Sequence, residues 1–260
     1  MKDNIKKSKV FLFDLDGTVY VGDKPIGNVA ETMNFLRGKG IRVGYLTNNS
    51  SVTKEFYIEK LVKMGLWEEG DFFYSSLDSA IDYISDNMKD DVFFPEATER
   101  VSEYIKSKGV KTGEDATAVL LTFDKELTYK KLEIANELLI FGKKYIATHP
   151  DATCPAPVAP VPDVGSFMCL LEKSSGRTPD VITGKPYGIM AENVIKALKV
   201  RKEDVTMVGD FLLTDIAFGV NGGFNTIMVL TGHSTEEQAE KGDIHPDLIL
   251  KDVNELTKII

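Results

Sequence analysis

The chain has 260 residues and a formal net charge of −9, with 43% hydrophobic and 27% charged residues. This composition is that of a soluble globular protein, and the acidic balance argues against broad binding to nucleic acid, which needs clustered lysine and arginine. Because no apolar run is long enough for a secretory leader or a membrane span, we expect no membrane partner.

The first third of the chain alternates strand and helix patterns. Residues 10–15 form an apolar run that stops at carboxylates, which is typical of a buried parallel strand. Residues 28–39 have helical spacing of apolar side chains and are followed by Gly40, where a helix stop is expected. A second strand is predicted at residues 41–46 and a second helix at 53–64. This alternation predicts a parallel α/β sheet.

The rest of the chain repeats the alternation. In the middle third, strands are predicted at residues 92–94, 118–122 and 145–148, with helices at 98–108 and 129–141. In the last third, strands are predicted at residues 181–183, 205–208, 226–230 and 247–250, with helices at 189–198, 215–221 and 253–259. The middle third therefore holds enough material for a second α/β unit.

Two carboxylates, Asp14 and Asp16, follow the first predicted strand in the segment Asp14-Leu15-Asp16-Gly17-Thr18. Such a pair suggests a site for a hard cation, since Mg²⁺ prefers carboxylate oxygens. Neighbouring carboxylates also separate each other's proton affinities, so that one can stay ionised while the other works as acid and base. Gly17 permits a sharp turn close to a phosphate. The alternative is a turn or helix cap built from aspartate and threonine.

Three further predicted strands end at polar residues. Thr47 and Asn48 follow the second strand, and their hydroxyl and backbone N–H groups either hold phosphate oxygens or cap a helix. Lys185, in the turn Gly184-Lys185-Pro186, either neutralises phosphate charge or is an ordinary surface lysine. Asp210 can complete a metal shell, and Asp215 is either a helix cap or a group that supports the metal ligands from behind. Open α/β sheets bind ligands at such strand ends.

Taken together, these residues resemble the four motifs of the haloacid dehalogenase (HAD) superfamily. Closer matches resemble its subfamily IIA, the NagD-like and p-nitrophenyl phosphatase-like enzymes. The matching segments are Asp14-Leu15-Asp16-Gly17-Thr18-Val19-Tyr20, Thr47-Asn48-Asn49-Ser50, Ala147-Thr148-His149-Pro150-Asp151, Gly176-Arg177-x-Pro179-Asp180, Gly184-Lys185-Pro186 and Thr214-Asp215-Ile216. The resemblance covers essentially the whole chain and is specific for the subfamily, but it says little about the substrate.

The resemblance implies an α/β fold with a Rossmann-like parallel sheet core and an inserted α/β cap of the C2 type. The spacing supports this independently, because the stretch between Thr47 and Lys185 is far longer than one crossover needs. We predict a core at residues 1–76 and 180–260 and a cap at residues 77–179.

The resemblance also implies a magnesium-dependent phosphatase that acts on small phosphomonoesters such as sugar phosphates or nucleotides. Asp14 would be the nucleophile that forms an aspartyl-phosphate, and Asp16 the acid and base. Mg²⁺ would bind Asp14, the backbone carbonyl of Asp16, and Asp210, while Thr47 and Lys185 hold the phosphate.

Supporting roles follow from the same resemblance. Gly17, Thr18 and Asn48 would assist phosphate binding, and Asp215 would support the metal ligands. His149 and Asp151, in the cap, would contact the substrate.

The expected partner is a small phosphorylated metabolite, and family analogy suggests a homodimer formed through the cap. The two cysteines, Cys154 and Cys169, form no Cys-x-x-Cys pair, so we expect a reduced, cytoplasmic protein. Two alternatives stay open: a phosphotransferase or phosphomutase that uses the same intermediate, and a non-catalytic protein that binds a phosphorylated ligand.

Three positions near the motifs stand apart. Many relatives carry arginine or another polar residue where this chain has Phe211, and many carry asparagine where it has His149. His233 follows a predicted strand end, but a lone histidine in a loop more often has no special role.

Overall fold

The computed structural model describes residues 2–156 and 158–260. Met1, in the predicted core, and Pro157, in the predicted cap, lie outside the described residues. The chain divides into two compact units. The first comprises Met1–Thr47, Glu55–Tyr74 and Lys185–Ile260, and the second comprises Asn48–Lys54 and Ser75–Gly184. Among the described residues, no helix is both long enough and apolar enough to cross a membrane.

A six-stranded sheet forms the centre of the first unit, in the order β14-β13-β12-β1-β4-β5. Its strands are β1 (Val10–Phe13), β4 (Arg42–Thr47), β5 (Phe72–Ser75), β12 (Val205–Gly209), β13 (Asn225–Val229) and β14 (Leu248–Leu250). Strand β1 is buried along its whole length and pairs in parallel with both β12 and β4. The residues that follow β1, β4 and β12 therefore emerge at the same edge of the sheet.

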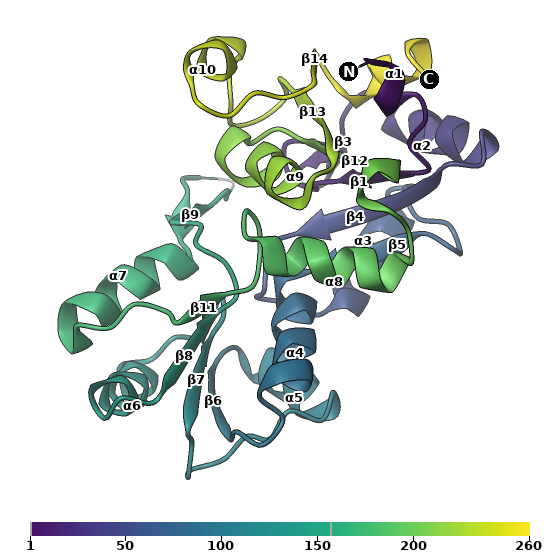
Figure 1. The fold of residues 1–260 in the computed structure, drawn as a ribbon. Coiled ribbons are helices and arrows are strands. Elements are labelled where there is room, and N and C mark those ends of the chain that lie inside the picture. The colour runs from purple at the N-terminus through teal and green to yellow at the C-terminus, as the bar shows by residue number, and fades with distance from the viewer. Residues whose placement is uncertain (1, 157) are drawn as a thin grey trace. The chain divides into compact units, whose positions relative to one another are not determined.

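Helices of the first unit pack on this sheet (Figure 1). They are α1 (Lys2–Ile5), α2 (Val29–Gly38), α3 (Lys54–Lys63), α8 (Gly188–Leu198), α9 (Ala217–Gly222) and α10 (Glu236–Lys241). Other helical turns are the 3-10 segments η1 (Lys202–Asp204) and η3 (Val253–Lys258) and the π-helical turn η2 (Leu212–Ile216). One core cluster joins Met190 and Val194 of α8 and Phe218 of α9 to apolar side chains of β1 and β12. Strands β2 (Tyr20–Val21) and β3 (Lys24–Pro25) form a small hairpin after the first motif.

The second unit is built on a four-stranded parallel sheet, in the order β11-β8-β7-β6. Its strands are β6 (Phe93–Glu96), β7 (Ala118–Leu121), β8 (Lys144–Ala147) and β11 (Val181–Ile182). Its helices are α4 (Ser76–Asn87), α5 (Glu99–Ser107), α6 (Tyr129–Ile140) and α7 (Val164–Ser175). One core cluster lies between the sheet and α4 and α5, and another between the sheet and α6 and α7, so helices cover both faces (Figure 1).

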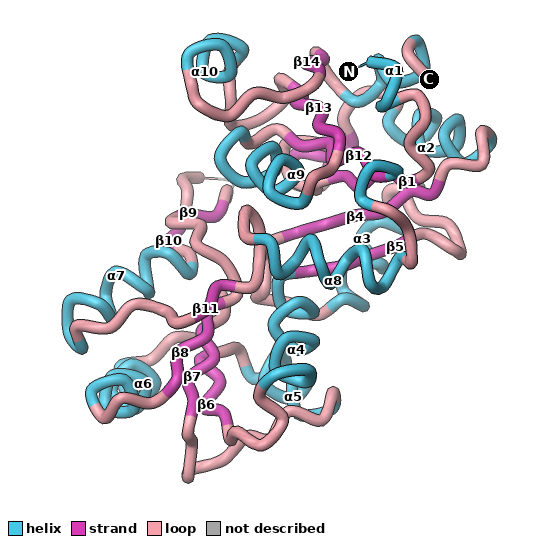
Figure 2. The backbone as a smooth tube through the Cα atoms, in the orientation of Figure 1, coloured by secondary structure: helices cyan, strands magenta, loops and turns pink. Residues whose placement is uncertain are grey.

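A short antiparallel hairpin of β9 (Thr153–Cys154) and β10 (Val161–Pro162) precedes α7 (Figure 2). Asp163 caps α7, because its side chain accepts a hydrogen bond from the backbone N–H of Val164.

The predicted α/β class with parallel sheets is confirmed, but the local assignments differ in instructive places. The strand predicted at residues 181–183 pairs with β8 in the smaller sheet, with Val181 opposite Ile146. Lys185 therefore does not follow a strand of the sheet that carries Asp14.

The boundaries between the compact units fall at residues 74/75 and 184/185, and the short segment Asn48–Lys54 groups with the second unit. The core and cap boundaries that we predict, at 76/77 and 179/180, stay predictions. Strand β5 and helices α4, α7 and α10 have no counterpart among the predicted elements.

Candidate active site

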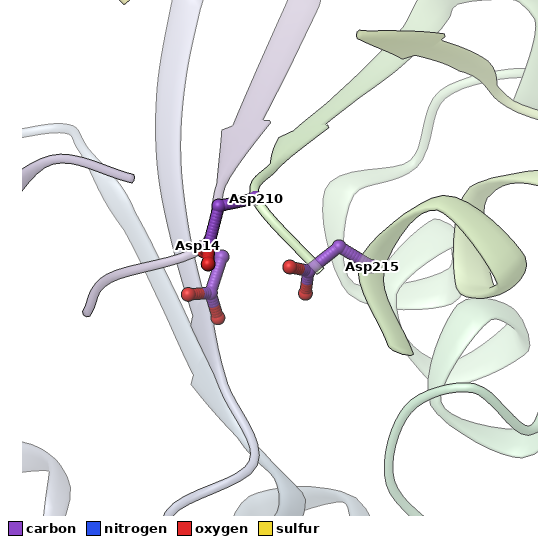
Figure 3. Close-up of side chains that lie close together, drawn as sticks. All are labelled: Asp14, Asp210 and Asp215. Carbon is purple, nitrogen blue, oxygen red and sulfur yellow. The ribbon is translucent and has the colours of Figure 1, made fainter. Parts of the chain in front are cut away.

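Asp14 and Asp210 follow neighbouring strands of the first unit. The backbone N–H of Asp14 donates to the carbonyl oxygen of Val208 at 2.9 Å, so the ladder between β1 and β12 continues to the aspartate. Asp210 comes directly after β12. Because parallel strands end at a common edge, the two side chains lie close together, as Figure 3 shows.

Asp215 completes a cluster of three carboxylates. One oxygen from each of Asp14, Asp210 and Asp215 lies within 4.8 Å of the others. Asp210 and Asp215 are 1% and 2% exposed, whereas the side chain of Asp14 keeps 16% of its surface open. Asp14 is therefore the member of the cluster that a ligand can reach.

Lys185 is the cation of this cluster, and it is almost fully buried. Its Nζ donates to Oδ1 of Asp14 at 2.5 Å and to Oδ1 of Asp215 at 2.7 Å. Burial alone would lower the pKa of Lys185, but the two carboxylates outweigh burial and raise that pKa well above its usual range, so the side chain stays charged. The reading of Lys185 as an ordinary surface charge is therefore wrong.

Three carboxylates face a single lysine, so negative charge is in excess. Burial, and then the neighbouring charge of Asp215, raise the pKa of Asp14 well above its usual range, although Lys185 acts in the opposite direction. Burial and the charge of Asp215 also raise the pKa of Asp210. A cation bound here would relieve this repulsion.

Asp210 is held by donors on both of its oxygens. The hydroxyl of Thr18 donates to Oδ1 at 2.9 Å, and the backbone N–H of His233 donates to Oδ2 at 2.7 Å. Gly17 has a φ of +85°, and a Cβ there would lie 2.7 Å from Oδ2 of Asp210. The turn after β1 therefore needs glycine for its backbone conformation and for the space beside this carboxylate.

Asp215 is oriented by the backbone around it. Its Oδ2 accepts a hydrogen bond from the backbone N–H of Phe211 at 3.1 Å, while its Oδ1 accepts from Lys185. It lies in the π-helical turn Leu212–Ile216, a rare conformation that often marks functional sites. A Cβ on Gly209 would lie 2.2 Å from Cβ of Asp215, so this packing requires glycine at the end of β12.

The carboxylate cluster fits a divalent cation with oxygen ligands. Asp14 and Asp210 offer carboxylate oxygens, their charge is only partly balanced, and hard cations prefer such donors.

Asp16 lies two residues beyond Asp14 and has an exposed side chain. In the turn that holds it, the N–H of Gly17 donates to the carbonyl of Tyr20 at 2.8 Å. The roles predicted for Asp16 in metal binding and in proton transfer stay predictions.

Thr47 and Asn48 fall on either side of a unit boundary. Thr47 is the last residue of β4, next to β1, and is buried. Asn48 belongs to the second unit, where its Nδ2 donates to Oδ2 of Asp151 at 3.0 Å. Their predicted contacts with phosphate stay predictions.

His149 and Asp151, the two cap candidates, belong to the second unit, and His149 is completely buried. Its Nε2 lies 3.0 Å from Oδ1 of Asp163, and its Nδ1 lies 3.1 Å from the hydroxyl of Thr148. Since a carboxylate only accepts, Nε2 carries the proton that it donates to Asp163. Both ring nitrogens have protein partners, and the substrate contacts predicted for His149 and Asp151 stay predictions.

Sequence reasoning missed the backbone donors of this site, and it set His233, near the predicted active edge, aside as a loop residue that more often has no special role. The N–H groups of Phe211 and His233 hold Asp215 and Asp210, and the hydroxyl of Thr231 donates to the carbonyl of Gly17 at 2.5 Å. A signal was present, because Thr231 and Gly232 follow β13, a further strand of the same sheet. Asp163, the partner of His149, gave no motif signal.

Comparison with known proteins gives matches to haloacid dehalogenase-like hydrolases. Residues 11–111 match a family model described as haloacid dehalogenase-like hydrolase, and residues 182–256 match a HAD-hydrolase-like model. The chain is 33% identical over 252 residues to an acid sugar phosphatase of Staphylococcus haemolyticus, covering 96% of this chain and 95% of the relative.

Two solved structures of similar proteins cover almost the whole chain. A 4-nitrophenylphosphatase from Thermotoga maritima has a TM-score of 0.93 and 37% identity, with 98% of each chain covered. A solved structure that carries the NagD name has a TM-score of 0.91 and 35% identity, covering 97% of this chain and 98% of that one. These similarities extend over both compact units.

Proposed function

We propose, since the chain belongs to the haloacid dehalogenase-like hydrolases and within them to the NagD-like phosphatases of subfamily IIA, that it is a magnesium-dependent phosphatase of small phosphomonoesters. The reaction would pass through an aspartyl-phosphate on Asp14. The observation that carries this proposal is the contact of Lys185 with both Asp14 and Asp215, in a cluster where only Asp14 stays partly open.

Asp14 is proposed as the nucleophile. Lys185 lies against its Oδ1 and favours the anionic form, which attack requires. An oxygen of Asp14 would form a bond to phosphorus while the bond from phosphorus to the ester oxygen breaks. Asp16 would give its proton to the leaving oxygen.

The second half of the reaction uses the same two residues. Asp16, now a carboxylate, would take a proton from water, and the water oxygen would form a bond to phosphorus. The bond between phosphorus and Asp14 then breaks and inorganic phosphate leaves. The exposed side chain of Asp16 is compatible with exchange of a proton with water.

Asp14, Asp210 and the backbone carbonyl of Asp16 would hold Mg²⁺. The ion, when bound, would offset the repulsion between the phosphate and the carboxylates. Asp215 would keep Lys185 in place through its contact at 2.7 Å, and Lys185 and Thr47 would bind the remaining phosphate oxygens.

The substrate class follows from the relatives. One relative is named an acid sugar phosphatase and another a 4-nitrophenylphosphatase, so we propose sugar phosphates and similar small metabolites as substrates. The family role of a cap is proposed for the second unit, with Asn48, His149 and Asp151 contributing to substrate binding. A cytoplasmic location, supported by the free cysteines Cys154 and Cys169, and a homodimer through the cap are proposed as well.

A panel of phosphate esters tests this function. Sugar phosphates, nucleotides and p-nitrophenyl phosphate are assayed for release of phosphate with Mg²⁺ and with a chelator, and are ranked by kcat/KM. We expect magnesium-dependent release, highest for sugar phosphates, and none from Asp14→Asn. Release that is equal with the chelator would contradict the metal requirement. Transfer to an added acceptor sugar would identify a phosphotransferase, and binding without turnover would identify a binding protein.

A further inference from the structure

The loop of residues 231–234, after β13, closes on Asp210. The backbone N–H of His233 donates to Oδ2 of Asp210 at 2.7 Å, and the backbone N–H of Ser234 donates to the carbonyl oxygen of Asp210 at 3.1 Å. A Cβ on Gly232 would lie 1.9 Å from Oδ2 of Asp210. The space beside this carboxylate therefore leaves no room for a side chain at position 232.

The same loop is tied to the turn that carries the first motif. The hydroxyl of Thr231 donates to the carbonyl oxygen of Gly17, and the next residue, Thr18, donates to Oδ1 of Asp210. Asp210 therefore receives one hydrogen bond on each oxygen, from two different loops. Two donors on two oxygens fix the plane of a carboxylate, and each oxygen keeps a lone pair for a cation.

Two contacts join the loop to Phe211 and Leu212. The imidazole of His233 stacks on the ring of Phe211, with centroids 4.9 Å apart and an angle of 26° between the planes. The hydroxyl of Ser234 accepts a hydrogen bond from the backbone N–H of Leu212 at 2.8 Å. Phe211 also donates its N–H to Asp215, so its position bears on two of the three carboxylates.

His233 has an exposed side chain, so its packing on Phe211 contributes little to a hydrophobic core. The stack instead holds residue 233, whose backbone N–H donates to Asp210, against residue 211. Phe211 stands where many members of the family have a polar residue, and here it has an aromatic partner across the loop. Phe211, one of the two departures from the family pattern, is therefore in contact with His233.

We propose that Phe211 and His233 are positioning residues, whose ring stack orients Asp210 for binding a divalent cation. Because the carboxylate is already fixed, less conformational freedom is lost when the ion binds. This inference rests on the metal site of the proposed function. Loss of the ring stack would lower the affinity for the metal more than the affinity for the substrate.

Metal titration of the purified protein tests this proposal. Binding of Mg²⁺ is measured by calorimetry, and binding of Mn²⁺ by its spin-resonance signal, for the wild type and for Phe211→Ala and His233→Ala. We expect each alanine variant to bind metal about tenfold more weakly, the lower end of the effect of removing a group that orients a ligand. With saturating Mg²⁺, the KM for p-nitrophenyl phosphate should change less than twofold.

Two further variants separate the ring stack from other causes. His233→Phe keeps the stack and the backbone N–H, so it should bind metal like the wild type. Leu213→Ala removes an exposed side chain of the neighbouring turn and serves as the matched control. Melting temperatures in chelator show whether each variant is folded.

The outcomes are distinguishable. If the wild type binds metal and both alanine variants bind it equally well, the positioning role is wrong and the proposed function stands. If His233→Phe loses as much affinity as His233→Ala, the imidazole itself matters and the ring stack does not. If the wild type binds no divalent cation, the metal site of the proposed function fails, and this inference fails with it.

Discussion

Asp14, Asp210 and Asp215 in the first unit and Glu96 in the second are all largely withdrawn from water, but their surroundings differ. Asp14 and Asp215 share Lys185, and Asp210 and Asp215 accept hydrogen bonds from backbone N–H groups. Glu96 is 0% exposed at the end of β6, and neither of its carboxylate oxygens has a hydrogen-bond partner among the described residues.

The surroundings of Glu96 favour its neutral form. Burial, and then the nearby charge of Asp124, raise the pKa of Glu96 to about 7. Lys131 acts in the opposite direction but donates its own hydrogen bond to Asp124 at 2.7 Å. Tyr145 is buried nearby, and its hydroxyl likewise has no partner among the described residues.

The contrast shows two ways to bury an acid. In the first unit a buried lysine and oriented N–H groups favour the charged carboxylates and oppose the rise in pKa that burial causes, and such fixed charges are what phosphoryl transfer needs. In the second unit Glu96 has no hydrogen-bond partner among the described residues, and burial favours its protonated form. The first arrangement indicates a reactive site, and the second indicates a carboxyl group whose charge depends on pH.

Removal of Lys185 should have the largest effect on stability and activity, because it leaves the buried carboxylates without a hydrogen-bonded cation, as Glu96 is among the described residues of the second unit. Lys185→Met leaves buried carboxylates without their cation, and we expect a loss of about 3–5 kcal/mol in the free energy of unfolding. We also expect kcat/KM to fall about 10²–10³-fold, as for loss of one oriented donor. Urea unfolding in chelator and hydrolysis of p-nitrophenyl phosphate measure these two effects.

Lys241→Met is the control for that substitution. Lys241 pairs with Glu237 at the surface, both side chains being more than 70% exposed, so its loss should cost less than about 1 kcal/mol. Equal stability changes in the two lysine variants would mean that the buried contacts of Lys185 contribute nothing.

Glu96→Gln should have the next largest effect, and the effect should depend on pH. The pKa of Glu96 is about 7 in the folded protein because of burial, against an ordinary value of 4.5. Below pH 4.5 the group is protonated in both states. Between pH 4.5 and 7 the unfolded chain loses the proton while the folded protein keeps it, so stability falls as pH rises, by about 3 kcal/mol in total.

Glutamine has no proton to lose, so Glu96→Gln should gain about 3 kcal/mol relative to the wild type between pH 4 and pH 8. Chemical denaturation at several pH values measures this difference. Glu103→Gln, at an exposed position of α5, is the control and should show no such trend. A flat difference for Glu96→Gln would mean that this carboxyl group is hydrated or paired when the protein is folded.

Gly17→Ala should have the smallest effect on stability. Alanine is strained at a φ of +85°, which costs about 1–2 kcal/mol, and its Cβ would press on Oδ2 of Asp210. Gly22→Ala is the matched control, because Gly22 has a φ of +61° and nothing within 4 Å of its Cβ position. Both variants should lose stability, Gly17→Ala more than Gly22→Ala because of this contact, but only Gly17→Ala should lose kcat/KM. Equal activity of the two would show that Asp210 tolerates displacement.

Several parts of this site could be predicted from sequence. Apolar runs that end in polar residues placed Asp14, Thr47 and Asp210 at strand ends, and parallel strands bring such ends together. The motif pattern added Lys185 and Asp215, whose contacts then appear in the structure.

Other parts could not be predicted, for physical reasons. The strand Val181–Ile182 is too short to reveal which sheet it joins, and it joins the smaller one. The donors to Asp210 and Asp215 include backbone N–H groups, which every residue except proline carries, so no residue type indicates them. That Glu96 meets no hydrogen-bond partner in the described part of the chain depends on packing between distant segments, which local periodicity does not record.

The claim that Asp14 carries the phosphoryl group is tested most directly by trapping it. Asp16→Asn is mixed with p-nitrophenyl phosphate, whose leaving group needs little protonation, and is quenched in acid before peptide mass spectrometry. Because water activation is impaired, we predict that the peptide containing Asp14 gains one phosphoryl group, and that Asp14→Asn in the same background gains none. An unmodified Asp14 peptide while p-nitrophenol is released, or a phosphoryl group on another residue, would contradict the assignment.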